Sequence, residues 1–416
     1  MKKTLIALSI VAGLMLAASP ASSEVYIDGF LQGLYGARLD QDNPTATEQT
    51  ASETRLQLRA EDFGDKGEFF ARLDFIYDGA DSADYDWELR EGYLKFRLGS
   101  NFDFKVGRQI LTWGTGDLIF INDVFAKDYR SFFVGRDDQY LKAPQNALRM
   151  EYYNSLGNFS AVWTPRFEGN RLPTGRRLSY YNPMVGATVG EGYFFDPPPP
   201  DSKFENGEIA TRFSRQVGNF NTALYFYKGF YKNPLGFDPV AMSAVYPRLN
   251  LYGASIRGAI AGGVLWAEGG YYDSRDDRDG DNPYRPNSSV TGMLGFERQV
   301  ASNLTVNGQW QVDYMLDHDI FKAQQMPGVY VRDEARHLLT SRVTQLLNSE
   351  LVTLSGFVFY SPTDEDAYVR LSVDYKYSDE ISLTVGGNIF DGGHQNTEFG
   401  QFASNDNVYM KMTYGF

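Results

Sequence analysis

Apolar and polar side chains alternate along short segments from residue 25 to the end of the chain. Within 405–416, one set of alternate positions is apolar, namely Val408, Met410, Met412, Tyr414 and Phe416. Because successive side chains of a β-strand point to opposite faces, this pattern predicts a strand with one apolar and one polar face. The same alternation recurs at 69–77, 304–314 and 368–377. The chain is therefore predicted to be all-β.

Segmentation by alternation and turn residues predicts 18 strands. They lie near 25–39, 53–62, 68–78, 86–98, 103–110, 146–154, 158–165, 207–216, 219–231, 247–259, 262–273, 288–298, 302–315, 335–348, 351–360, 366–377, 380–391 and 405–416. The number falls to 16 if the two weakest segments, near 158–165 and 207–216, are not strands. Either even number suits a closed antiparallel barrel.

The connections between these strands alternate between tight turns and long stretches. Turns such as 99–102 and 217–218 would lie at one end of the barrel, and stretches such as 111–145 and 166–206 at the other. Outer-membrane barrels have short periplasmic turns and long external loops. We therefore expect a transmembrane β-barrel in the bacterial outer membrane, with both termini in the periplasm.

The first 23 residues have the features of a secretory signal peptide. Lys2 and Lys3 precede an apolar run at 5–18, and small residues follow as far as Ser23. This run is shorter than the about 20 residues that a membrane-spanning helix needs. We predict that residues 1–23 are removed and that 24–416 form one barrel. No later run is long and apolar enough for a spanning helix.

Composition narrows the possible functions. The chain has no cysteine, which excludes disulfides, thiolate metal sites and cysteine nucleophiles. Its 28 Tyr and 30 Phe suit the aromatic girdles of a barrel. The net charge is −14, and −16 without Lys2 and Lys3, so nucleic acid is a poor candidate partner. No cofactor-binding motif is present, and we expect no cofactor.

The segment 111–145 is too long for a simple hairpin loop, and loops of such length are usually functional or disordered. Its many aromatic and branched residues argue against disorder, so we expect it to fold back into the barrel mouth and narrow the pore. The candidate constriction residues are Trp113, Asp117, Asp123, Lys127, Asp128 and Arg130. The alternative is an external loop packed on its neighbours.

The polar stripes of the predicted strands supply candidate pore-lining residues. The candidates on the early strands are Arg55, Arg59, Arg72, Asp74, Glu91 and Lys95. Charges of both signs nearly balance over the whole lumen, so ion selectivity does not follow from their number. Arg55, Arg59 and Arg72 would form a basic ladder on neighbouring strands, unless they simply pair with carboxylates across the strands.

Several motifs resemble a large group of outer-membrane porins that includes alginate-export-type barrels. They are Arg90–Leu94 (REGYL), Val106–Gln109 (VGRQ) and Trp113–Gly114. The C-terminal Phe416 resembles the signal that the barrel-assembly machinery of Gram-negative bacteria reads. The resemblance implies a barrel of about 18 strands, set in lipid and lipopolysaccharide, that conducts a polar small-molecule solute. Polysaccharide exporters of this group are expected to have a strongly basic lumen, from which this chain departs.

Other functions stay open at this stage. The barrel would alternatively sheathe a periplasmic partner, such as an electron-transfer cytochrome or a polysaccharide-export component. A hydrolase is disfavoured, because the chain has three histidines and none of the usual catalytic motifs. The loop 273–281 loosely resembles a calcium loop but lacks its spacing. We therefore expect a solvated external loop, with divalent cations as candidate partners, and not a true calcium loop.

Overall fold

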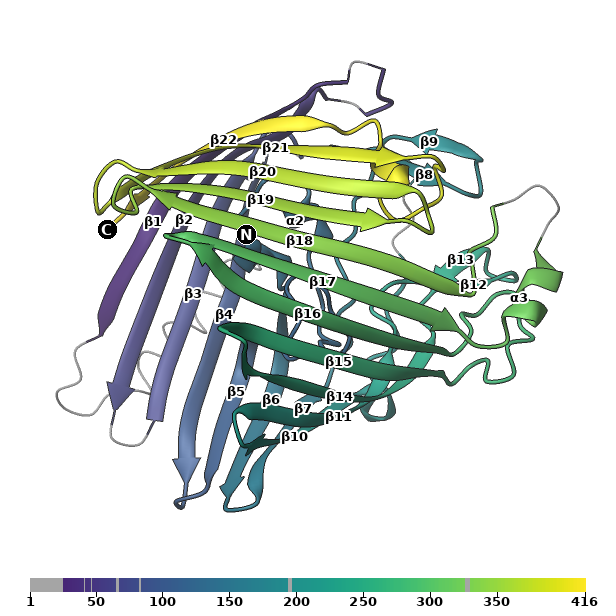
Figure 1. Cartoon of the computed structure of the whole chain (residues 1–416), viewed down its shortest axis with the longest axis horizontal. Coiled ribbons are helices and arrows are strands. Elements are labelled where there is room, and N and C mark those ends of the chain that lie inside the picture. The colour runs from purple at the N-terminus through teal and green to yellow at the C-terminus, as the bar shows by residue number, and fades with distance from the viewer. Residues whose placement is uncertain are drawn as a thin grey trace.

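The computed structural model describes residues 25–40, 42–45, 47–64, 67–81, 84–193, 197–325 and 330–416; the predicted signal peptide lies outside them. Eighteen of the described strands form one antiparallel sheet. They are β1 (Tyr26–Arg38), β2 (Gln49–Gly64), β3 (Gly67–Asp78), β4 (Asp84–Leu98), β5 (Phe102–Ile110), β6 (Pro144–Asn154), β7 (Gly157–Thr164), β10 (Glu208–Val217), β11 (Phe220–Phe230), β14 (Arg248–Ile260), β15 (Gly263–Ser274), β16 (Ser289–Ala301), β17 (Leu304–Met315), β18 (Ala335–Leu347), β19 (Val352–Ser361), β20 (Asp366–Lys376), β21 (Ile381–Gly392) and β22 (Asn407–Gly415). Figure 1 shows them side by side around the barrel.

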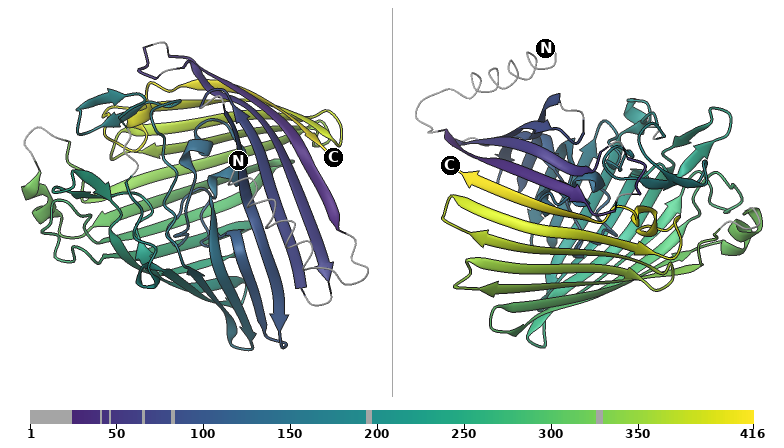
Figure 2. Two further views of the ribbon diagram at one scale, coloured as in Figure 1. Left: turned by 180° about the vertical axis from the view of Figure 1, so that it is seen from behind. Right: turned by 90° about the horizontal axis from the view of Figure 1, so that it is seen from above.

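The sheet closes on itself through its first and last strands. β1 pairs with β22 from Phe30 opposite Gly415 to Arg38 opposite Asn407. Figure 2 shows these two strands side by side. The predicted closed barrel of 18 strands is thus confirmed, and the two weakest predicted segments are the strands β7 and β10.

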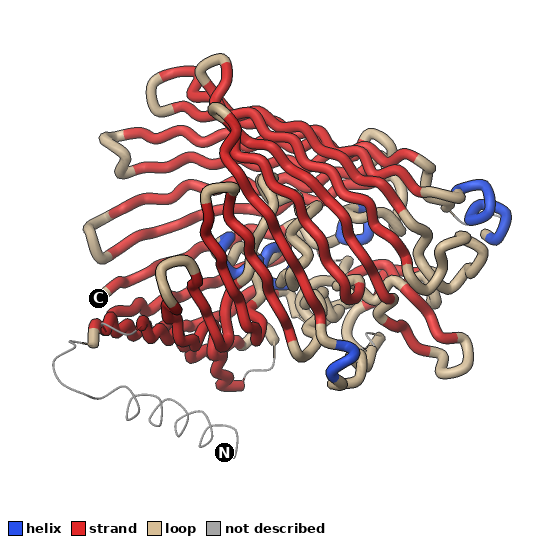
Figure 3. Tube along the Cα trace, turned by 90° about the horizontal axis from the view of Figure 1, so that it is seen from below, coloured by secondary structure: helices blue, strands red, loops and turns tan. Residues whose placement is uncertain are grey.

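The remaining elements are short and lie in the long connections (Figure 3). They are the helices α2 (Tyr129–Phe132) and α3 (His318–Gln324), the strand pairs β8 (Tyr180–Asn182) with β9 (Ala187–Val189) and β12 (Gly236–Asp238) with β13 (Ser243–Val245), and the 3-10 turns η1 (Asp138–Leu141), η2 (Phe204–Asn206) and η3 (Gly400–Phe402). No helix among the described residues is both long enough and apolar enough to cross a membrane.

The predicted tight turns that the structure describes in full lie at one end of the barrel, where β22 ends. Gly262 has φ 72° and Ala261 has φ 51° in the turn between β14 and β15. Positive φ at both central residues matches the twist of a two-residue hairpin. The short connections let neighbouring strands pair along nearly their whole length, while the opposite end carries the long loops.

The two faces of the sheet differ as the alternation predicts. On β22 the side chain of Met410 is 61% exposed, whereas Tyr409, which points inward, is 3% exposed. Large apolar side chains are exposed at alternate positions of the other strands as well, for example Leu31 and Tyr35 on β1. In a soluble protein so wide an apolar surface would be unstable in water, so the outer face is the lipid face.

The buried core lies inside the barrel. One cluster joins Ile119, Phe132 and Phe133 of the 111–145 segment to inward-pointing side chains of β15, β16 and β18–β21. A second joins Trp113 and Phe125 to side chains of β7, β10, β11 and β14. The segment 111–145 therefore folds into the lumen and packs there, as expected from its aromatic content.

Candidate functional site

The first half of the segment 111–145 is fastened to the inner wall by a buried glutamate. Glu268 on β15 is 4% exposed. Its carboxylate accepts the backbone N–H groups of Thr115 at 2.6 Å and of Asn122 at 2.7 Å, and the Thr115 hydroxyl at 2.9 Å. Hydrogen bonds to an ionised acceptor are stronger than neutral ones. One carboxylate thus holds together two points of the chain that are separated by a turn.

A second anchor involves Asp117, near the tip of that turn. The amide side chain of Gln309 on β17 accepts the backbone N–H of Asp117 and donates to its carbonyl oxygen, both at 2.8 Å. The carboxylate of Asp117 accepts from the Arg342 Nε at 2.8 Å and from the Asn307 amide at 2.9 Å. The turn is therefore held by three strands of one side of the barrel, β15, β17 and β18.

The second half of the segment is fastened by ion pairs across the barrel. Arg136 donates to Glu53 on β2 at 2.8 Å, and Asp138 accepts from Arg370 on β20 at 2.9 Å. Asp137 pairs with Lys411 on β22. These strands lie on either side of the closure between β1 and β22, so the segment 111–145 spans the lumen from β15 to β2.

Aromatic packing reinforces these polar anchors. The ring of Phe133 lies 5.4 Å from those of Tyr368 and Phe390 and 5.0 Å from that of Phe402. Such contacts contribute about 0.5–1.5 kcal/mol per pair beyond the burial of area. We call the inward-pointing residues of β15–β22 and β1–β4 that hold the segment the anchored wall.

Most side chains of the periplasmic half of the opposite wall stay accessible, whereas Ser160, Ala223 and Ser255 are buried. This half is formed by the inward-pointing residues of β7, β10, β11 and β14, four strands that are described in full, and we call it the basic wall. Its residues are Asn158, Ser160, Arg212, Ser214, Gln216, Asn221, Ala223, Ser255 and Arg257. They contribute two arginines and no carboxylate.

The two arginines of the basic wall make no ion pair with a carboxylate among the described residues. The Arg257 guanidinium donates to the carbonyl oxygen of Thr115 at 3.2 Å and lies over the Trp266 ring. The Arg212 guanidinium lies over the Tyr225 ring, and its Nε has no hydrogen-bond partner. A cavity of about 450 Å³ lies between them and the tip of the 111–145 segment. This cavity has a positive wall.

Comparison with known proteins identifies the fold. No protein-family model matches the chain, and no curated protein is similar to it in sequence. Its structure is similar to OccAB4 of Acinetobacter baumannii, with a TM-score of 0.57 over 94% of this chain and 98% of that one, at 10% identity. OccK3 (OpdO) of Pseudomonas aeruginosa gives a TM-score of 0.56 over 94% and 96%, also at 10% identity. The chain is an outer-membrane β-barrel with the porin fold. The alginate-export-type resemblance has no counterpart in these comparisons and stays a prediction.

Within this barrel the predicted lining residues divide into two groups. Arg55 and Asp74 point inward but are 2% and 0% exposed, because Tyr140 of the segment covers them. Arg55 donates to Glu53 at 2.8 Å and also pairs with Asp74, and its guanidinium carbon lies 4.2 Å from the Tyr140 ring centroid. This pair lies underneath the segment 111–145 and belongs to the anchored wall.

The other predicted lining residues lie nearer the periplasm and are paired with carboxylates. Arg59 donates to Asp28 at 2.9 Å. Arg72 lies 3.5 Å from Glu91, and Lys95 lies 3.1 Å from Glu68. These charges pair across strands, which was the simpler of the two expectations. Whether they line the path of a solute stays a prediction.

Most of the predicted constriction residues have structural partners inside the segment. Asp123 and Lys127 are buried, with their charged groups 3.0 Å apart. Burial lowers the pKa of the Lys127 ammonium, and the adjacent Asp123 opposes that shift. Asp128 caps α2 by accepting the backbone N–H of Ser131 at 3.0 Å. Trp113 packs edge-on against Phe125. Asp117 and Arg130 keep part of their side chains accessible.

Several residues of this lumen escaped prediction. Arg257 was missed because the inward stripe of its strand is mostly small or apolar, so polarity did not show which face points inward. Asp137 and Asp138 were missed because a long segment has no alternation to orient its side chains. Their charge is opposite to that of Lys411 and Arg370, with which they pair, but the fold decides which residues pair.

The groups that could bind a metal or act in catalysis are dispersed over the part of the barrel that the structure describes. No three His, Asp or Glu side chains in the described part of the chain are grouped as a metal ion would need. In the predicted cation loop, Asp273 instead pairs with Arg278 at 2.9 Å. His318 lies in α3, and His337 lies on β18, 3.2 Å from the Trp310 indole nitrogen. Binding of divalent cations by external loops stays a prediction.

Proposed function

We propose that this porin is a passive channel that favours small anionic solutes. The observation that carries the proposal is the basic wall, in which Arg212 and Arg257 face the lumen without a carboxylate to neutralise them. Clustering of one sign of charge along a pore decides its selectivity. Because the field of an unpaired cation is strongest where low-dielectric walls confine water, the anion concentration at this wall is raised.

The path of the solute runs between the basic wall and the tip of the segment 111–145. Asp117, held by Arg342, is the carboxylate of the constriction nearest to that path. Arg59, Arg72, Glu91 and Lys95 line its periplasmic end in this proposal, as paired charges that keep the wall wet. Arg130 lies at the external end and Phe416 acts as the signal for barrel assembly into the outer membrane.

The filled lumen favours a diffusion channel over the two alternative roles. A barrel that sheathes a periplasmic protein needs free space along its axis, whereas here the barrel's own segment spans the lumen on anchors from β15 to β2. A path for a long polysaccharide would need basic groups along the whole wall. The two arginines of the basic wall lie instead on β10 and β14, near the periplasm.

Electrophysiology tests this function directly. The purified barrel is inserted into a planar lipid bilayer, and single-channel conductance and reversal potential are recorded in a gradient of potassium chloride. We expect discrete current steps and a reversal potential that indicates preference for chloride. Absence of ion current would contradict the channel, and preference for potassium would contradict the role of the basic wall.

A further inference from the structure

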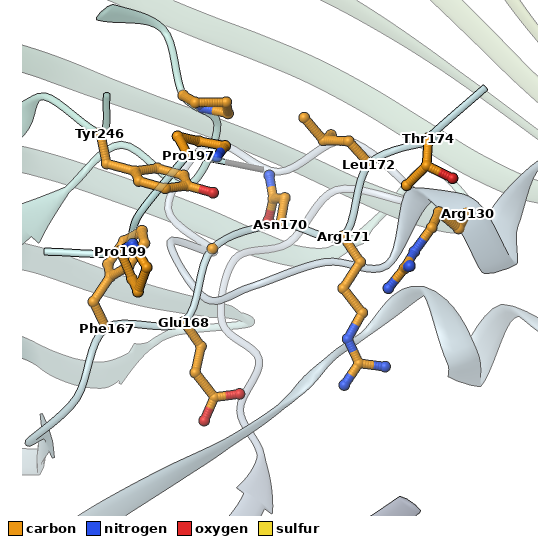
Figure 4. Close-up of a pocket in the computed structure, with 12 residues that line it drawn as sticks. Arg130, Phe167, Glu168, Asn170, Arg171, Leu172, Thr174, Pro197, Pro199 and Tyr246 are labelled. Atoms are coloured by element: carbon orange, nitrogen blue, oxygen red, sulfur yellow. The ribbon is translucent and has the colours of Figure 1, made fainter. Parts of the chain in front are cut away.

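A second cavity, of about 340 Å³, lies on the side of the long loops (Figure 4). Three connections form it: the segment 111–145 through Arg130, the β7–β10 connection through 167–174, Pro197 and Pro199, and the β11–β14 connection through Pro234 and Tyr246. Its volume falls within the range of about 300–1,000 Å³ that small-molecule sites occupy. The charged lumen described above is on the other side of the 111–145 segment.

The guanidinium of Arg130 is a cation without a partner in this cavity. Its side chain makes no hydrogen bond or ion pair with any residue that the structure describes. The two carboxylates with most influence on it are engaged elsewhere: Asp128 pairs with Arg171 at 3.4 Å, and Asp81 pairs with Arg177 at 3.0 Å. Burial lowers the pKa of Arg130, and the nearby Arg171 adds to that shift.

The other charged groups that line the cavity are neutralised by the protein. Arg171 donates to Glu88 at 2.5 Å, and Glu168 accepts from Arg108 at 3.1 Å. Their positions are thereby fixed, and they leave Arg130 as the group free to bind an anion. A charged group that is partly buried without a partner is unfavourable, and a ligand of opposite charge would relieve this.

The opposite side of the cavity is apolar. The ring of Phe167 lies 4.7 Å from that of Tyr246, and Pro197, Pro199 and Pro234 complete this side. Figure 4 shows Tyr246, Pro197 and Pro199 on one side and Arg130 and Arg171 on the other. The proline rings and the ring pair of Phe167 and Tyr246 form a rigid surface. An apolar group that binds there immobilises few protein side chains, so the entropic cost of binding is low.

We propose that this cavity is a binding site for a small organic anion, with the oxyanion on the Arg130 guanidinium and a compact apolar body against Tyr246 and the prolines. The site goes beyond the proposed channel, because it selects for shape and charge together on the external side of the 111–145 segment. A solute bound here is held at the mouth before it reaches the basic wall.

Binding is measured by isothermal titration calorimetry on the detergent-solubilised full-length barrel, with cyclohexanecarboxylate as the probe. We expect saturable binding at one site, and binding weaker by roughly tenfold for the neutral cyclohexanemethanol, which lacks the charge that Arg130 recognises. Acetate, which lacks the apolar body, is expected to bind weakly as well. Equal binding of the acid and the alcohol would overturn the assignment.

Two substitutions of Arg130 distinguish the loss of its positive charge from damage to the structure of the cavity. Arg130→Gln should weaken binding of the probe by roughly tenfold, and Arg130→Lys should recover part of it. The control Arg298→Gln, a change on the outer face of β16, should leave it unchanged. A Lys variant as weak as the Gln variant would show that charge at this position does not bind the probe.

The same preparation keeps the two proposals apart. An anion-selective wild-type channel that does not bind the probe would overturn the external site alone. Binding of the probe by a barrel that passes no ion current would overturn the channel and leave the external site standing.

Discussion

The anchored wall and the basic wall use the same residue type for different purposes. Arg55 on the anchored wall is buried between two carboxylates, with Tyr140 over it. Arg212 and Arg257 on the basic wall have aromatic neighbours but no carboxylate among the described residues. An arginine with buried partners stabilises the fold, whereas one without them imposes its field on the water in the pore. The partners, and not the residue type, decide the role.

The largest expected effect comes from Arg55→Gln, which leaves Asp74 buried without its paired cation and Glu53 with Arg136 as its remaining cation. Removing one partner of a buried ion pair destabilises a protein by about 3–5 kcal/mol. We expect a loss of this size in urea-induced unfolding of the barrel in phospholipid vesicles, with little change in ion selectivity of the remaining folded channels. A marked change in selectivity without destabilisation would place Arg55 on the solute path.

The complementary change is the double substitution Arg212→Gln and Arg257→Gln on the basic wall. Two unit charges about 4 Å apart in water interact with an energy of about 1 kcal/mol. This energy changes the local concentration of an ion by a factor of about five. Losing both should lower the chloride-to-potassium permeability ratio by roughly an order of magnitude, measured as the reversal potential at low salt, and stability should hardly change.

The control for this pair is again Arg298→Gln, since that side chain lies on the outer face near the same end of the barrel. It should leave the permeability ratio unchanged. In 1 M salt the effect of the double substitution should shrink, because the screening length falls to about 3 Å. An effect that does not depend on salt would indicate a change of pore shape and not of charge.

A structural feature can be predicted from the sequence when it depends on residues close together in the chain, and it escapes prediction when it depends on distant ones. Strands such as β7 and β10 follow from alternation, because each side chain's face is set by its immediate neighbours in the chain. The inward folding of 111–145 follows from its aromatic residues, which need burial. Tyr140 covers Asp74, whereas Arg212 stays accessible. This difference depends on the positions of Tyr140 and Thr115, which are set by contacts between residues far apart in the chain.

Deleting Thr115–Gly135 removes the part of the segment that, in our proposal, narrows the path along the basic wall. We expect single-channel conductance to rise several-fold, because the wider lumen holds more ions, and anion preference to fall as the arginines act on a larger cross-section. The deletion also uncovers the aromatic side chains around Tyr368, so folding is checked by heat-dependent migration on a gel. Unchanged conductance in a folded variant would show that the segment is not the constriction.

The smallest effect is expected at the border between the two walls, where Glu151 on β6 lies 2.5 Å from Arg149. Glu151→Gln removes the carboxylate and leaves Arg149 without its partner, beside the Ser160 position of the basic wall. Because this pair is partly exposed, the change is worth at most about 1 kcal/mol. The permeability ratio should rise toward chloride by less than about fivefold.

Ser160→Ala, which removes the hydroxyl that donates to Glu151 at 2.7 Å and changes no charge, is the matched control and should leave the ratio near that of the wild type. If Glu151→Gln moved the ratio toward potassium, the field of the basic wall would not extend to β6, and its border would lie at β7.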